Sequence, residues 1–145
     1  MDFRIKKGRD GRGGLVMRLL PGRYRGSISF EEAITVREGP FWFLERAIRE
    51  KCPGCVRFSH WGVTAIPRAE WLAVLAEWQA LKSRAQLAAL PIELQVLRYV
   101  AIDTRVEFLR DFSRNCRKLT LLIDQVSSWL MRELETHEEI TLLGI

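Results

Sequence analysis

The sequence predicts an α+β domain in which a small, mainly antiparallel sheet is covered by three or four helices. Apolar residues recur every three or four positions over three long segments, which indicates helices with one buried face. Short strand-like segments lie near both ends of the chain, one with alternating apolar and basic side chains and one rich in large aliphatic side chains. No repeat or low-complexity linker divides the 145 residues, 48% of which are hydrophobic, so residues 1–145 are expected to form a single domain.

The N-terminal part is expected to form short strands. Residues 3–6 alternate apolar and basic side chains, and residues 15–20 are predicted to be the partner strand, after a basic, Gly-rich loop or arm at about 6–14. Pro21, followed by a glycine, ends this second strand. Residues 27–30 are either a third strand or the start of a helical turn.

The first helix is expected to begin at Gly39-Pro40, because the missing N–H of proline costs nothing at the first helical position. It should end before Pro53, which is followed by glycine. The apolar face of this helix consists of Phe41, Leu44 and Ile48.

A strand over residues 58–66 and a second helix are expected to follow. Pro67 closes the strand and opens the helix, and Glu70 lies in the first turn, where the helix dipole favours an acid. The helix, or a pair of helices, continues toward Pro91. Its buried stripe consists of Trp71, Val74, Trp78 and Leu81.

The C-terminal helix shows the most regular pattern. Thr104 and Glu107 have the spacing of a capping box, and an apolar stripe follows, with a break near Ser113 left open. Residues 139–145 are predicted to form a short docked strand, because a free tail would expose four large aliphatic side chains. The helix stripe consists of Val106, Leu109, Phe112, Cys116, Leu119, Ile123, Val126, Leu130 and Leu134.

The formal charge of +5 is concentrated near the N-terminus. Residues 1–25 carry eight of the 23 Lys and Arg residues and two of the 18 Asp and Glu residues, so the rest of the chain is close to neutral. A basic arm with an Arg-Gly-Gly unit at residues 12–14 would suit phosphates. A single unit without interleaved aromatic residues is more typical of a solvated loop. A nucleic-acid-binding module is therefore the alternative hypothesis for function.

The sequence also predicts the compartment. No apolar run reaches the roughly 18 residues needed to span a membrane, and the first residues lack the apolar stretch of a signal peptide. Three cysteines are too few for a disulfide framework. We therefore expect a cytoplasmic protein that does not contact the membrane.

One group of residues could bind a metal ion and another could act as general bases, but neither group forms a complete motif. Cys52 and Cys55 have the spacing of a zinc-binding pair, and His60 and Cys116 could complete the site, but the usual second pair is missing. His60 and His137 could act as general bases beside carboxylates, yet no nucleophile elbow or phosphate loop accompanies them. We therefore predict no metal, no cofactor and no catalytic residue.

Large aromatic residues crowd into one part of the chain. Because Phe41 faces inward on a helix, Trp42 or Phe43 must be partly exposed. Partly exposed aromatic side chains are favoured anchors of protein interfaces, and a shared aromatic core is the other explanation. The residues are Phe41, Trp42, Phe43, Phe58, Trp61, Trp71 and Trp78.

Four segments share a recognisable pattern: residues 38–44 (EGPFWFL), 58–67 (FSHWGVTAIP) leading to Trp71, 110–116 (RDFSRNC) and 140–145 (ITLLGI). Together they resemble small bacterial immunity proteins, which are encoded beside polymorphic toxins, including those of contact-dependent growth inhibition systems. The resemblance covers about residues 28–145. It implies a cytoplasmic, non-enzymatic protein that binds the C-terminal domain of one cognate toxin and blocks its active site or its access to substrate.

On this hypothesis, aromatic side chains and carboxylates between the helices bind the toxin domain. Binding should be tight and only modestly dependent on salt, whereas binding of a nucleic acid by the N-terminal arm would collapse with salt. The predicted partner-binding residues are Glu38, Trp42, His60, Trp61, Asp103, Glu107 and Asp111.

Overall fold

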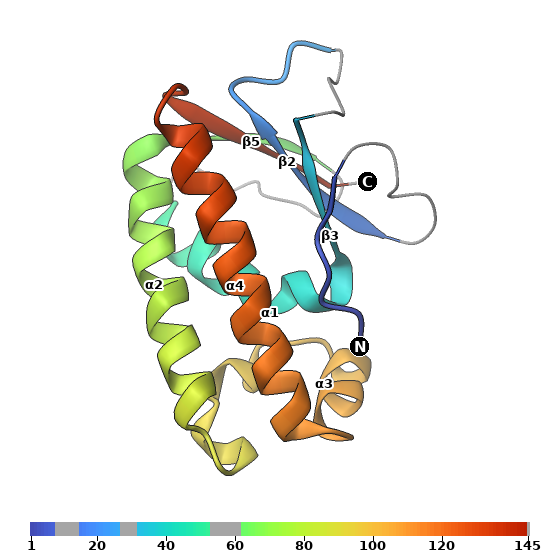
Figure 1. The fold of residues 1–145 in the computed structure, drawn as a ribbon. Coiled ribbons are helices and arrows are strands. Elements are labelled where there is room, and N and C mark those ends of the chain that lie inside the picture. The colour runs from blue at the N-terminus through green and yellow to red at the C-terminus, as the bar shows by residue number, and fades with distance from the viewer. Residues whose placement is uncertain (8–14, 27–31, 53–61, 145) are drawn as a thin grey trace.

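Helices cover one face of a small sheet, which confirms the predicted α+β class. The computed structural model describes residues 1–7, 15–26, 32–52 and 62–144. Two long helices, α2 (Arg68–Leu87) and α4 (Phe112–Leu134), pack side by side along the sheet (Figure 1). The shorter α1 (Glu38–Lys51) packs against α2, and α3 (Ile102–Leu109) packs against the start of α4. Two 3₁₀ turns, η2 (Pro91–Glu93) and η3 (Gln95–Arg98), connect α2 to α3.

The strands of the described residues form one antiparallel sheet in the order β1-β3-β2-β5-β4. The last strand in the sequence therefore lies inside the sheet, between two strands that come much earlier. The strands are β1 (Lys6–Lys7), β2 (Val16–Pro21), β3 (Ile34–Arg37), β4 (Val63–Pro67) and β5 (Glu139–Gly144).

The buried stripe predicted for the second helix is confirmed. Trp71 and Trp78 are fully buried in the layer between α2 and its neighbours, with ring centroids 6.0 Å apart. Burying an indole costs free energy unless its N–H finds an acceptor. Trp71 Nε1 donates to the carbonyl of Ile140 at 3.1 Å, and Trp78 Nε1 donates to the carbonyl of Leu44 at 3.0 Å. The two tryptophans therefore tie α2 to β5 and to α1.

The docked C-terminal strand is also confirmed. Leu142 pairs with Leu19 of β2 on one side and with Thr64 of β4 on the other, and it is fully buried against the helices. Because β5 has a neighbour on each side, its backbone is not available to pair with another protein. These residues therefore do not form an edge strand of the sheet.

The N-terminal strand pairing differs from the prediction. Residues 6 and 7 pair with β3 rather than with β2, and the strand is only two residues long. Phe3 does not continue the strand, because its ring is buried between Phe43 and Phe108, with centroids 6.1 Å from each. Residues 27–30, predicted as a third strand or the start of a helical turn, lie outside the described residues, and the third strand of the structure, β3, begins later, at Ile34.

The beginning of the C-terminal helix is corrected by the structure. The chain bends at residues 110 and 111, so one predicted helix is two. Helix α3 begins after Ala101, and no side chain caps its N-terminus, so the capping box predicted for Thr104 and Glu107 does not exist. Phe108 fills the core, while Val106 is half exposed. The burial of the Phe108 ring in the core therefore determines which face of α3 is buried.

Candidate functional site

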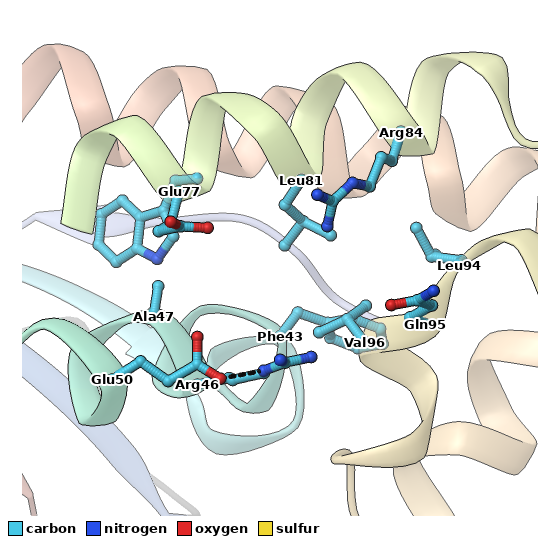
Figure 2. Close-up of a pocket in the computed structure, with 11 residues that line it drawn as sticks. Phe43, Arg46, Ala47, Glu50, Glu77, Leu81, Arg84, Leu94, Gln95 and Val96 are labelled. Atoms are coloured by element: carbon cyan, nitrogen blue, oxygen red, sulfur yellow. Dashed lines mark hydrogen bonds and ion pairs between the residues drawn. The ribbon is translucent and has the colours of Figure 1, made fainter. Parts of the chain in front are cut away.

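A pocket lies in the groove between α1, α2 and the 3₁₀ turns. We call it the interhelical pocket, and its cavity volume is about 230 Å³. Figure 2 shows α2 along one side, α1 along the other and the segment at 94–96 closing one end. Its lining residues are Phe43, Arg46, Ala47, Glu50, Glu77, Trp78, Leu81, Arg84, Leu94, Gln95 and Val96.

The rim of the interhelical pocket is charged, and three of its charges are fixed by ion pairs. Arg46 Nε donates to Glu50 Oε1 at 2.6 Å, one helical turn away on α1. Glu77 on α2 pairs with Lys51 at 2.9 Å, and this hydrogen bond lowers the pKa of the Glu77 carboxyl. Both rim carboxylates are therefore held in place by charge-assisted hydrogen bonds.

A second pocket lies on the other side of Arg46. We call it the aromatic pocket; it has a volume of about 400 Å³ and is lined by Trp42, Glu45, Arg46, Arg49, Glu50 and Tyr99. The Arg46 guanidinium lies 4.0 Å from the centroid of the Tyr99 ring, within the range of a cation–π contact. Arg46 and its ion-pair partner Glu50 line both pockets, so together they form the wall between them.

Helix geometry explains how α1 builds this wall. Trp42, Arg46 and Glu50 follow each other at intervals of four residues, so they lie along one face of the helix. Glu45 is almost completely buried behind this face and accepts a hydrogen bond from Arg49 at 2.5 Å. The opposite face carries the buried residues predicted from the sequence, including Phe41, Leu44 and Ile48.

The residues predicted to bind a partner do not form one site. Trp42 is half buried in the aromatic pocket, whereas Glu38 and Glu107 line a separate depression beside the N-terminal residues. Glu107 pairs there with the N-terminal ammonium at 2.7 Å. Asp103 and Asp111 are exposed at opposite ends of α3. His60 and Trp61 lie outside the described residues.

The sequence predicted Trp42 but none of the other residues that line the aromatic pocket, among them Arg46 and Tyr99. Arg46 could have been found, because its spacing of four from both Trp42 and Glu50 indicates one helical face. Tyr99 gave no signal, because it directly follows η3 in a segment without helical or strand periodicity. Only the fold brings Tyr99 to α1.

The candidate zinc and acid-base residues are placed as follows. Cys52 is buried after α1 and is disulfide-bonded, which removes its thiolate as a metal ligand. Burial raises the pKa of the free Cys116 thiol to about 11, so it stays protonated inside the α4 stripe. His137 Nδ1 lies 2.9 Å from the carbonyl of Glu133 at the end of α4. Cys55 lies outside the described part, within which no group of three His, Cys, Asp or Glu residues could hold a metal ion.

The helices of the described segments include none that is long and apolar enough to cross a membrane. No family model, curated protein sequence or solved structure matches this chain.

Proposed function

We propose that this chain is an immunity protein that binds a cognate toxin domain in the cytoplasm and blocks it. The aromatic pocket is the observation that carries the proposal. It presents Trp42, Tyr99 and Arg46 together at the surface. Trp, Tyr and Arg are the residue types that contribute most to binding energy at protein interfaces. One of the four segments that resemble immunity proteins, residues 38–44, includes Trp42 and begins the helix that also carries Arg46.

The pocket is also prepared for binding before a partner arrives. Arg46 is held between Glu50 and the Tyr99 ring, and Arg49 is held by the buried Glu45. A partner would therefore lose little side-chain entropy on binding here, because these rotamers are already fixed. Trp42 is held on a well-packed helix, and its exposed part remains available as an anchor.

The alternative, a nucleic-acid-binding module, has less support from the described basic residues. Arg4 donates to Asp2 at 2.8 Å, and Arg23 donates to Glu139 at 2.8 Å. Phosphate groups would have to compete with these carboxylates for the same guanidinium groups. Residues 8–14 of the basic arm lie outside the described part, so the structure adds no support for a phosphate site there.

The experiment that tests the proposal starts from the neighbouring gene. A large toxin gene immediately upstream is expected, and its C-terminal domain should bind this protein and become harmless when both are expressed together. We expect Trp42→Ala and Tyr99→Ala each to weaken binding at least tenfold by calorimetry, as at interface hot spots, where truncation costs more than about 2 kcal/mol. Both variants should also reduce protection of growing cells.

Leu72→Ala is the matched control, because Leu72 is exposed on α2 and lines neither pocket. Its binding should stay within a factor of two of the parent. The proposal fails if the upstream domain does not bind. If the domain binds and the Trp42 and Tyr99 variants match the control, the aromatic pocket is not the binding site.

A further inference from the structure

Helix α3 carries an apolar stripe that faces away from the rest of the molecule. Ile102, Val106 and Leu109 are 69%, 48% and 39% exposed. Their spacing of four and three residues places all three on one face of the helix. The buried residue of α3 is Phe108, on the opposite side, which packs against Phe43 and Phe112. Figure 1 shows α3 at the outer edge of the molecule, below the N-terminus.

Two opposite charges lie along one flank of this stripe. Asp103 and Arg110 are both exposed, and Arg110 continues the helical backbone with φ −57° and ψ −30°. At about 100° per residue the two side chains point in nearly the same direction from the helix axis. They are seven residues apart, roughly 10 Å along the axis, too far to pair with each other. Within the described part of the chain, neither side chain takes part in an ion pair.

This arrangement is self-complementary. In two antiparallel copies of α3 related by a two-fold axis at Val106, Ile102 of one copy faces Leu109 of the other. A two-fold axis perpendicular to both helices keeps the charged flank on the same side in both copies. Asp103 of each copy then lies beside Arg110 of the other, so the symmetry makes two ion pairs across the contact.

We propose that this chain self-associates through α3, as a symmetric antiparallel helix pair. The surface is separate from the aromatic pocket, so the inference goes beyond the proposed function and does not depend on it. Two helices of eight residues bury little area, at the low end of specific interfaces, below about 1,200 Å². The dimer should therefore be weak and visible only at high protein concentration, with a dissociation constant on the order of 100 µM.

Sedimentation equilibrium of the full chain from about 20 µM to 1 mM tests the proposal without any toxin. We expect the average mass to rise with concentration and the rise to shrink in high salt, because salt screens the ion pairs. Val106→Glu should weaken association at least tenfold, because it places two carboxylates together on the two-fold axis. Met131→Glu, at a similarly exposed site on α4, is the matched control and should leave association unchanged. Circular dichroism shows whether each variant is folded, and Ile102→Ser replaces Val106→Glu if the latter is not.

Charge-reversal variants of Asp103 and Arg110 test whether the two copies of α3 pair in the antiparallel arrangement. Asp103→Arg and Arg110→Asp should each weaken association severalfold, because each places like charges together twice in the dimer. The double variant should restore association to within about threefold of the parent, because the pairs re-form with opposite sign. A protein that stays monomeric at 1 mM overturns the proposal. Unchanged association in Val106→Glu, or a double variant as weak as the single ones, overturns the α3 contact.

Discussion

At the scale of single residues, the pair of Asp2 and Arg4 gives the structure a measurable dependence on pH. Arg4 donates to both carboxylate oxygens of Asp2, at 2.8 and 3.1 Å, and these hydrogen bonds lower the pKa of Asp2 to about 2. A carboxyl group with a lowered pKa in the folded state stabilises the protein above its unfolded pKa of 3.8, and this contribution is lost as the pH falls toward 2.

We expect Asp2→Asn to lower the free energy of unfolding at pH 7 by less than about 1 kcal/mol, because Arg4 is solvent-exposed and the pair is screened. The difference from the parent should shrink between pH 4 and pH 2. Urea unfolding at several pH values measures it. Arg4→Gln should remove most of the same pH-dependent difference, and a difference that persists unchanged at pH 2 would show that the ion pair is not its source.

At the scale of elements, strand β5 joins the two halves of the sheet. It pairs with β2 through five residue pairs and with β4 through five more, and it lies between them in the strand order. Deleting residues 139–145 should therefore separate β4 from the rest of the sheet and uncover apolar surface on the helices. We expect the shortened protein to aggregate or to lose its cooperative thermal transition, measured by circular dichroism and light scattering. A shortened protein that melts within a degree or two of the parent would contradict the central role of β5.

Side chains on the two faces of β5 are buried in different clusters, so we expect single substitutions on the two faces to lower the free energy of unfolding by different amounts. Leu142 belongs to the main core, whereas Leu143 lies in a small cluster with Leu20, Ala33 and Tyr24. Leu142→Ala should cost about 2–5 kcal/mol of unfolding free energy, the range for a buried leucine in a close-packed core. Leu143→Ala should cost less, because fewer buried neighbours lose contacts. Urea midpoints for the two variants compare the faces directly, and equal losses would contradict this assignment.

At the scale of the whole molecule, the distribution of charge predicts how strongly the protein binds nucleic acid. Residues 1–25 carry eight basic and two acidic residues, so they account for the whole positive net charge, and Arg4 and Arg23 within this part are already paired with carboxylates. We expect only weak RNA binding that falls steeply as salt rises from about 50 to 200 mM, as for non-specific phosphate contacts. Fluorescence anisotropy with a labelled single-stranded RNA measures it. Submicromolar affinity at about 150 mM salt would favour the nucleic-acid alternative over the proposed function.

The sequence by itself determined the elements whose patterns are local. Proline and the three-to-four spacing of apolar residues located α1, α2 and most of α4, because backbone restriction and helical periodicity act over neighbouring residues. The same reasoning predicted that Trp42 or Phe43 must be partly exposed, because one helix cannot bury Phe41, Trp42 and Phe43 on a single face, and in the structure Trp42 is half-buried while Phe43 is buried. It also found the docked strand at the C-terminus from its apolar content.

Only the tertiary structure decided the strand order and the candidate site. Pairing β5 with β2 joins residues about 120 positions apart, and no local pattern encodes which strands meet. The inward turn of Phe108 left the face of α3 with Val106 exposed, although the sequence extended the buried stripe through Val106. Tyr99 reaches Arg46 only because the 3₁₀ turns fold back beside α1. Long-range packing selects among arrangements that local preferences leave equally open, and in this protein that selection formed the aromatic pocket.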